Sequence, residues 1–328
     1  MSFEMLIAFI QQSLRLSSTL LLGSTGEIIT EKSGNLNLGT PGIMAGGAIS
    51  GIVGAYFYTG AVETVNPLLG VLITLLCGLI GSLVVTLIYC FLTITLKTNQ
   101  NVTGLALTTF GVGISNFIGS LINSKMGGTG IAAFPEIGKA YRASLPFAEN
   151  LGWFGDIFLS YGFMTYLAII IALVVAFVIT KTRIGLNLRA VGENPATADA
   201  AGINVDKYKY VATCLGGMIS GLGGLCYVMD FAAANWQNNI LDQFGWLAVA
   251  LVIFAVWRPN IAIIGSIIFG ALYVIGPFLL GLSNKDQELI KILPYLVTII
   301  VLVIISIRDK KENQPPASLG LSYFREER

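Results

Sequence analysis

The sequence contains no histidine, and only 11% of its residues are charged. Histidine is the commonest general base and a usual ligand of zinc and haem, so this chain lacks a group that most enzyme mechanisms need. The four cysteines lie inside apolar stretches without CxxC or metal-ligand spacing, which favours a role as small apolar side chains. We therefore expect no catalytic residue, no metal and no cofactor in this chain.

The sequence also lacks a nucleotide-binding loop of the kind that ends in Gly-Lys-Ser/Thr. Its one Gly-Lys pair, Gly138 and Lys139, is followed by Ala140. The net charge of +1 comes without a cluster of Lys and Arg, which argues against nucleic acid as a partner. Any ATP-driven process would therefore need the ATPase site of another subunit.

The chain is instead rich in apolar residues: 55% of its residues are hydrophobic and 38 are glycine. This composition indicates an integral membrane protein, and crossings of roughly 20 residues predict an all-α bundle of about nine spans, with eight to ten allowed. The first span carries Arg15 and Glu27, which fits a helix partly buried in the bundle. The expected spans are 10–30, 40–60, 67–96, 103–122, 161–180, 210–230, 243–258, 261–283 and 292–307.

Lys and Arg gather in the connections on one side of this bundle, including residues 181–209 and 308–328. The positive-inside rule makes that side cytoplasmic and places the N-terminus outside. Residues 123–160 then form an extracellular loop, folded over the bundle or else a disordered connector. The polar tail, residues 308–328, contains a Pro-Pro pair and is expected to be mobile.

Residues 181–209 carry the marks of a short cytoplasmic helix. Asn194 suits an N-cap, Pro195 the first helical position and Gly202 the left-handed position after the helix. The alanine-rich faces of this short helix are too small to form a core of their own. This favours packing of the helix into a groove of another protein. An ordinary cytoplasmic loop is the alternative.

Polar amides and glycines precede the second span, at Asn35, Asn37 and Gly39. Irregular backbone at membrane depth persists only where it is buried or lines a cavity, so these residues are candidates for a transport pathway. Thr108 and Asn116 in the fourth span could hydrogen-bond a polar solute. A plain cytoplasmic turn would also explain the residues before the second span. Helix capping or hydrogen bonds between helices would also explain Thr108 and Asn116.

Three segments resemble the membrane permeases of bacterial ABC importers, in the branched-chain amino acid, ribose and nucleoside group. They are GEIITEKSGNLNLGTPGIMAGG after the first span, NQNVTGLALTTFGVGIS in the middle and RIGLNLRAVGENPATADAAGINVDKYK in the cytoplasmic segment. The first two are most similar to nucleoside-type permeases. The resemblance covers most of residues 14–307 and implies a type II importer-like permease domain over residues 1–307.

The resemblance also implies partners and roles. It implies a cytoplasmic ATPase that binds ATP and Mg, a second permease chain, an extracellular substrate-binding lipoprotein and a location in the plasma membrane. The residues that it assigns to ATPase coupling are Arg189, Gly192, Asn194, Pro195, Ala198, Ala200 and Gly202. The pathway candidates remain Asn35, Asn37, Gly39, Thr108 and Asn116.

Nucleosides are the substrate that motif similarity favours, with sugars and branched-chain amino acids as alternatives. A secondary carrier or channel is a rival class that would need no ATPase. Such carriers often use an acid buried in mid-span, whereas Asp230 and Asp242 fall near predicted span ends. A membrane-embedded enzyme is the third class, and the missing histidine argues against it.

Overall fold

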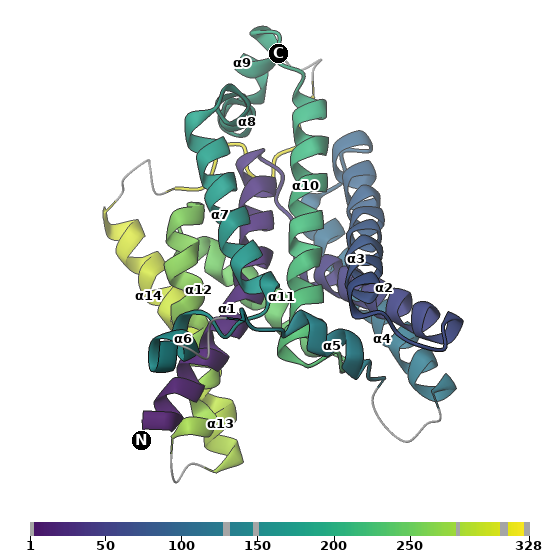
Figure 1. Ribbon diagram of the computed structural model, residues 1–328. Coiled ribbons are helices and arrows are strands. Elements are labelled where there is room, and N and C mark those ends of the chain that lie inside the picture. Colours follow the sequence, from purple (N-terminus) through teal and green to yellow (C-terminus); the bar gives the residue numbers. More distant parts are fainter. Residues whose placement is uncertain (1–2, 127–131, 147–150, 280–282, 309–313, 325–328) are drawn as a thin grey trace.

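The computed structural model describes residues 3–126, 132–146, 151–279, 283–308 and 314–324, and helices dominate them (Figure 1). Seven segments are long and apolar enough to cross a membrane, and two shorter apolar helices accompany them. Four of the long segments are the single helices α1 (Phe3–Lys32), α2 (Thr40–Ala61), α4 (Gln100–Lys125) and α7 (Phe163–Lys181). Two are α-helices that continue into a π-helical turn: α3 (Pro67–Cys90) with η1 (Phe91–Thr95), and α10 (Val205–Cys226) with η3 (Tyr227–Phe231). The seventh segment, Lys285–Ile304, runs from α13 (Asn284–Ile290) into α14 (Leu293–Arg308). The shorter helices are α11 (Ile240–Phe254) and α12 (Pro259–Val274).

Each of the nine predicted spans overlaps one of these segments, so the prediction of an all-α bundle is confirmed. The predicted span 261–283 extends too far. Its helix ends at Val274, and a short 3-10 turn follows at Gly276–Phe278. Pro277 has no backbone N–H to donate, so a continuing helix would lose a hydrogen bond at this position.

Asparagine caps begin several of the helices. The side chains of Asn66, Asn99 and Asn204 accept hydrogen bonds from the first turns of α3, α4 and α10. Such caps satisfy backbone N–H groups that have no partner within the helix. Because these groups would otherwise be unpaired near the membrane surface, the caps fix where each span starts.

Close helix packing places α1, α2 and α10 at the centre of the bundle. A Cβ on Gly47 of α2 would lie 2.7 Å from the Cα of Gly221 in α10, and one on Gly26 of α1 would overlap the carbonyl oxygen of Gly216. Only glycine permits such backbone contact. Glycine-rich faces of α1, α2 and α10 therefore pack against one another inside this chain.

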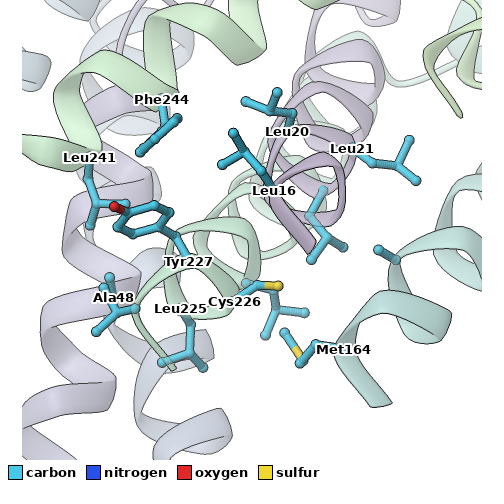
Figure 2. Packing of buried hydrophobic residues seen from close by; sticks show 14 of the residues in the cluster. Leu16, Leu20, Leu21, Ala48, Met164, Leu225, Cys226, Tyr227, Leu241 and Phe244 are labelled. Carbon is cyan, nitrogen blue, oxygen red and sulfur yellow. The ribbon is translucent and has the colours of Figure 1, made fainter. Parts of the chain in front are cut away.

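The buried core lies where α1, α10 and α11 meet. Figure 2 shows Leu16 and Leu20 of α1 gathered near Tyr227 and Phe244, and the two aromatic rings have centroids 4.6 Å apart. Large apolar side chains on α3, α7 and α14 remain exposed, among them Leu76 and Phe177. An exposed apolar belt is what a lipid-facing surface requires.

The two ends of the bundle carry different connections. Helices α8 (Arg183–Glu193) and α9 (Pro195–Ala200) lie at one end, and α5 (Pro135–Tyr141), α6 (Gly152–Phe158), α13 and the N-terminus lie at the other (Figure 1). The end with α8 and α9 is the one that the charge distribution assigns to the cytoplasm.

The described part of the predicted loop 123–160 folds over the opposite end of the bundle. Arg142 donates from Nε and Nη2 to the carbonyl oxygens of Asp230 and Phe231, at 2.5 and 2.7 Å. The Tyr141 hydroxyl lies 2.8 Å from Thr74 Oγ1, and burial raises the pKa of this phenol. Residues 127–131 and 147–150 lie outside the description. The described residues agree with a folded cover rather than with a disordered connector.

The prediction of a mobile C-terminal tail is wrong for residues 314–324. Ser318 donates its backbone N–H to Gly192 O at 3.0 Å, and Gly320 donates to Gly34 O at 3.3 Å. Both Pro316 and Ser318 are buried. The polar composition of the tail indicated mobility, but contacts with residues more than a hundred positions away hold it on the end of the bundle that carries α8 and α9.

Candidate functional site

The connection between α1 and α2 is buried irregular backbone. Residues 33–39 leave the helix after Lys32, and Asn35 and Asn37 are 0% and 2% exposed. Asn37 donates from Nδ2 to Glu27 Oε2 at 3.1 Å and accepts from the Gly39 N–H at 3.0 Å. Thr40 also donates to Glu27 Oε2. The predicted irregular backbone is therefore present and buried inside the protein.

Asn35 links this connection to α10 and leaves one acceptor free. Its Nδ2 donates to Thr213 Oγ1 at 3.2 Å, while Oδ1 is buried without a hydrogen-bond partner in the described part of the chain. Glu27 Oε1 is likewise buried without a hydrogen-bond partner among the described residues. A buried acceptor without a partner costs free energy, so these two oxygens are available to accept hydrogen bonds from a solute or from water that enters the connection between α1 and α2.

Thr108 also contacts the connection between α1 and α2, whereas Asn116 does not. Thr108 in α4 donates to Leu38 O at 2.7 Å, and a Cβ on Gly39 would lie 2.9 Å from the Leu107 side chain. Asn116 lies two turns farther along α4, where its Nδ2 donates to Asn239 Oδ1 at 2.6 Å. Four of the five pathway candidates therefore meet around one connection, and Asn116 belongs to a separate contact.

Helices α8 and α9 form the segment that the sequence singled out. Asn194 accepts from the Thr197 N–H at 3.0 Å, Pro195 begins α9 and Gly202 has φ +83°, as the capping pattern predicts. The sequence analysis missed α8. Its apolar residues Ile184, Leu188 and Val191 follow helical spacing, which is the signal that could have identified it.

The C-terminal end of α8 lies directly on the end of α1. A Cβ on Gly192 would overlap the Lys32 carbonyl oxygen and would lie 3.2 Å from Gly34 N. Gly34 has φ +83°, a conformation that favours glycine. Because Gly34 directly precedes Asn35, this backbone contact joins the α8–α9 element to the buried polar connection between α1 and α2.

The comparisons with known proteins decide the family. The sequence pattern of the family described as the branched-chain amino acid transport system permease component matches residues 9–302. This chain belongs to that permease family. The resemblance that the sequence motifs indicated is confirmed.

Three relatives match this permease over most of their length. A putative glucose ABC transporter permease protein of Haloferax volcanii is 33% identical over 94% of this chain and 95% of its own. A nucleoside ABC transporter permease protein of Lactococcus lactis is 31% identical, with 88% and 89% covered. A guanosine ABC transporter permease protein of Bacillus subtilis is 30% identical, with 91% and 92% covered. The chain is an ABC transporter permease component and a multi-pass protein of the plasma membrane.

The predicted coupling residues of this permease divide into two sets. Gly192 and Ala198 are buried within the chain, and Ala198 packs with Val191 and Val205. The exposed coupling residues are Arg189, Asn194, Ala200 and Gly202, with Pro195 half-buried. The exposed set is available to a partner, whereas the buried pair positions the two helices.

Two buried acids of the permease were not among the predicted site residues. Glu27 and Glu31 are 1% and 4% exposed, and Glu31 accepts a hydrogen bond from Trp257 Nε1 in the turn between α11 and α12. Their spacing of four puts both on one face of α1, which is a signal the sequence contains. Within the described residues, no group of three or more Cys, Asp or Glu could hold a metal ion.

Proposed function

We propose that this chain imports nucleosides as the permease subunit of an ATP-driven transporter, by alternating access. The observation that carries the proposal is the buried α1–α2 connection, where Asn35 Oδ1 and Glu27 Oε1 have no hydrogen-bond partner among the described residues. The hydroxyl and amino groups of a nucleoside are donors that match such acceptors. Relatives named for nucleosides and guanosine support this choice.

Energy would come from a separate ATPase that binds ATP and Mg and receives the α8–α9 element in a groove. The exposed side chains Arg189, Thr197 and Ala200 would face that subunit. The contact of Gly192 with Lys32 and Gly34 supports a direct mechanical route from this element to the pathway. A second permease chain would complete the pathway, and an extracellular lipoprotein would deliver the substrate.

A sugar is the second candidate substrate, because the Haloferax volcanii relative is named for glucose. Sugar hydroxyls would satisfy the same acceptors, so the buried polar connection does not discriminate between the two classes. Branched-chain amino acids remain a third possibility that rests on the description of the family.

Uptake by cells with and without this chain tests the proposal. Labelled guanosine, uridine and glucose would be supplied to each strain, before and after ATP is depleted. We expect nucleoside uptake that needs both the chain and ATP. Uptake of glucose alone would replace the proposed substrate, and uptake that follows an ion gradient after ATP depletion would refute the ABC mechanism.

A further inference from the structure

Residues 314–324 form a segment that we call the C-terminal strap. Its first half binds the end of α8 and the α1–α2 connection. The Ser318 N–H and Oγ donate to Gly192 O at 3.0 and 2.5 Å, and the Gly320 N–H donates to Gly34 O at 3.3 Å. Ala317 donates to the Glu193 carboxylate at 3.4 Å. The strap therefore lies across the place where α8 meets α1.

The second half of the strap binds α9 and the connection between η1 and α4. Tyr323 donates from its hydroxyl to Asp199 Oδ2 at 2.9 Å, and Ser322 Oγ donates to Lys97 O at 3.4 Å. The Lys97 ammonium lies 4.4 Å from the centroid of the Phe324 ring. This half joins the α9 helix to the cytoplasmic end of the α3–α4 pair.

These contacts add to those that already join α8 and α9 to α1, α7 and α10. Gly192 contacts the end of α1, and α9 packs mainly against α8 and α10. The ring of Tyr323 packs on the buried cluster of Val191, Ala198 and Val205. The strap thus adds a further connection between the α8–α9 element and the part of the bundle that surrounds the α1–α2 connection, beside the Gly192 contact and the packing on α10.

We propose that the C-terminal strap is a positioning segment for transport. It holds α8 and α9 against the α1–α2 connection, so that displacement of these helices by an ATPase moves Asn35 and its neighbours. Without the strap, α8–α9 would still dock on the ATPase, but its displacement would reach the α1–α2 connection only through the Gly192 contact and the packing of these helices on α7 and α10. This inference rests on the proposed function for its transport role, whereas the docking of the strap can be tested by itself.

The transport test uses the whole complex in proteoliposomes, with ATP hydrolysis and substrate uptake measured together. Ser318→Pro removes both donors to Gly192 O, since proline has no N–H and no hydroxyl. Tyr323→Phe keeps the ring and removes the bond to Asp199. A chain ending at Phe324 is the matched control, because it keeps every strap contact described above.

We expect both substitutions to leave ATP hydrolysis within about twofold of the control while uptake per ATP falls about fivefold or more, the range typical of coupling between sites. Unchanged uptake per ATP in both variants would overturn the proposal. If Ser318→Pro fails to accumulate, the conservative Tyr323→Phe variant decides alone.

A second measurement separates failure of the strap from failure of the proposed function. Ala198 is 2% exposed beneath the strap, so an Ala198→Cys probe should react slowly with a thiol reagent in purified permease lacking its native cysteines. Reaction about tenfold faster in the Ser318→Pro background would support docking, and an equal rate would refute it. This readout needs no ATPase, so it holds even if no ATP-driven uptake is found.

Discussion

Gly192→Ala tests whether the backbone contact between α8 and α1 transmits coupling. The added Cβ would overlap the Lys32 carbonyl oxygen and would approach Lys32 C at 3.1 Å and Gly34 N at 3.2 Å. All three atoms belong to the backbone, so no side chain can rotate away. Restoring ordinary contact requires α8 to move by about 1 Å from α1.

The expected loss follows from the cost of overpacking, which is typically about 1–3 kcal/mol. If this cost falls on the coupled arrangement, uptake per ATP falls about 5- to 150-fold. Alanine is a better helix former than glycine by about 1 kcal/mol, so α8 itself should not unfold. A loss of transport can then be assigned to the contact rather than to the helix.

The assay compares uptake and ATP hydrolysis in proteoliposomes containing the complete transporter. Gly113→Ala is the matched control, because a Cβ at this position of α4 meets nothing within 4 Å. We expect the control to behave as wild type. Wild-type uptake per ATP in Gly192→Ala would refute the idea that this contact transmits motion.

Three further predictions concern the α9 cap, the buried acids and the sidedness of the ends. Asn194→Ala removes the acceptor for the Thr197 N–H, so α9 should lose about 1 kcal/mol of stability and uptake should fall. Asn194→Asp keeps an acceptor and should preserve both the stability of α9 and uptake. Equal losses in the two variants would contradict a capping role. Trp257→Phe leaves Glu31 without its indole donor and should lower the free energy of unfolding by about 1–3 kcal/mol, measured by thermal denaturation in detergent; an unchanged melting temperature would show that this bond is not needed. In a chain without native cysteines, Ala201→Cys should react with an impermeant thiol reagent only from the cytoplasm and Ser144→Cys only from outside, and the reverse pattern would overturn the charge-based orientation.

Local signals in the sequence were sufficient to find the spans, apart from the end of the one predicted at 261–283, and to find α9. Asn194, Pro195 and Gly202 each act within a few residues of the helix they define, so their effect can be read without tertiary structure. Helix α8 escaped prediction because its apolar residues alternate with Arg183 and Arg189, which made the segment look like a basic loop. Its helical spacing becomes persuasive only when the burial of Leu188 and Val191 is known.

Contacts between distant residues explain what the sequence did not predict. Glu31 is paired with Trp257, 226 positions away, and Ser318 meets Gly192 across 126 positions. No local pattern links such pairs, and polar composition alone gave the wrong expectation for residues 314–324. The buried amides Asn35 and Asn37 were identifiable because irregular backbone beside an apolar span has few stable environments.

The arrangement of α1 gives the proposed motion a physical basis. This helix has 30 residues and is therefore about 45 Å long, so it reaches from the Gly192 contact to the far end of the bundle. At that far end, Gln11 Nε2 donates to Asp156 O at 2.8 Å, which ties α1 to α6. In between, Gly26 packs on the backbone of Gly216 in α10. Because these joints are backbone contacts or direct hydrogen bonds, a shift of α8 should move α1 and α10 together rather than deform one of them.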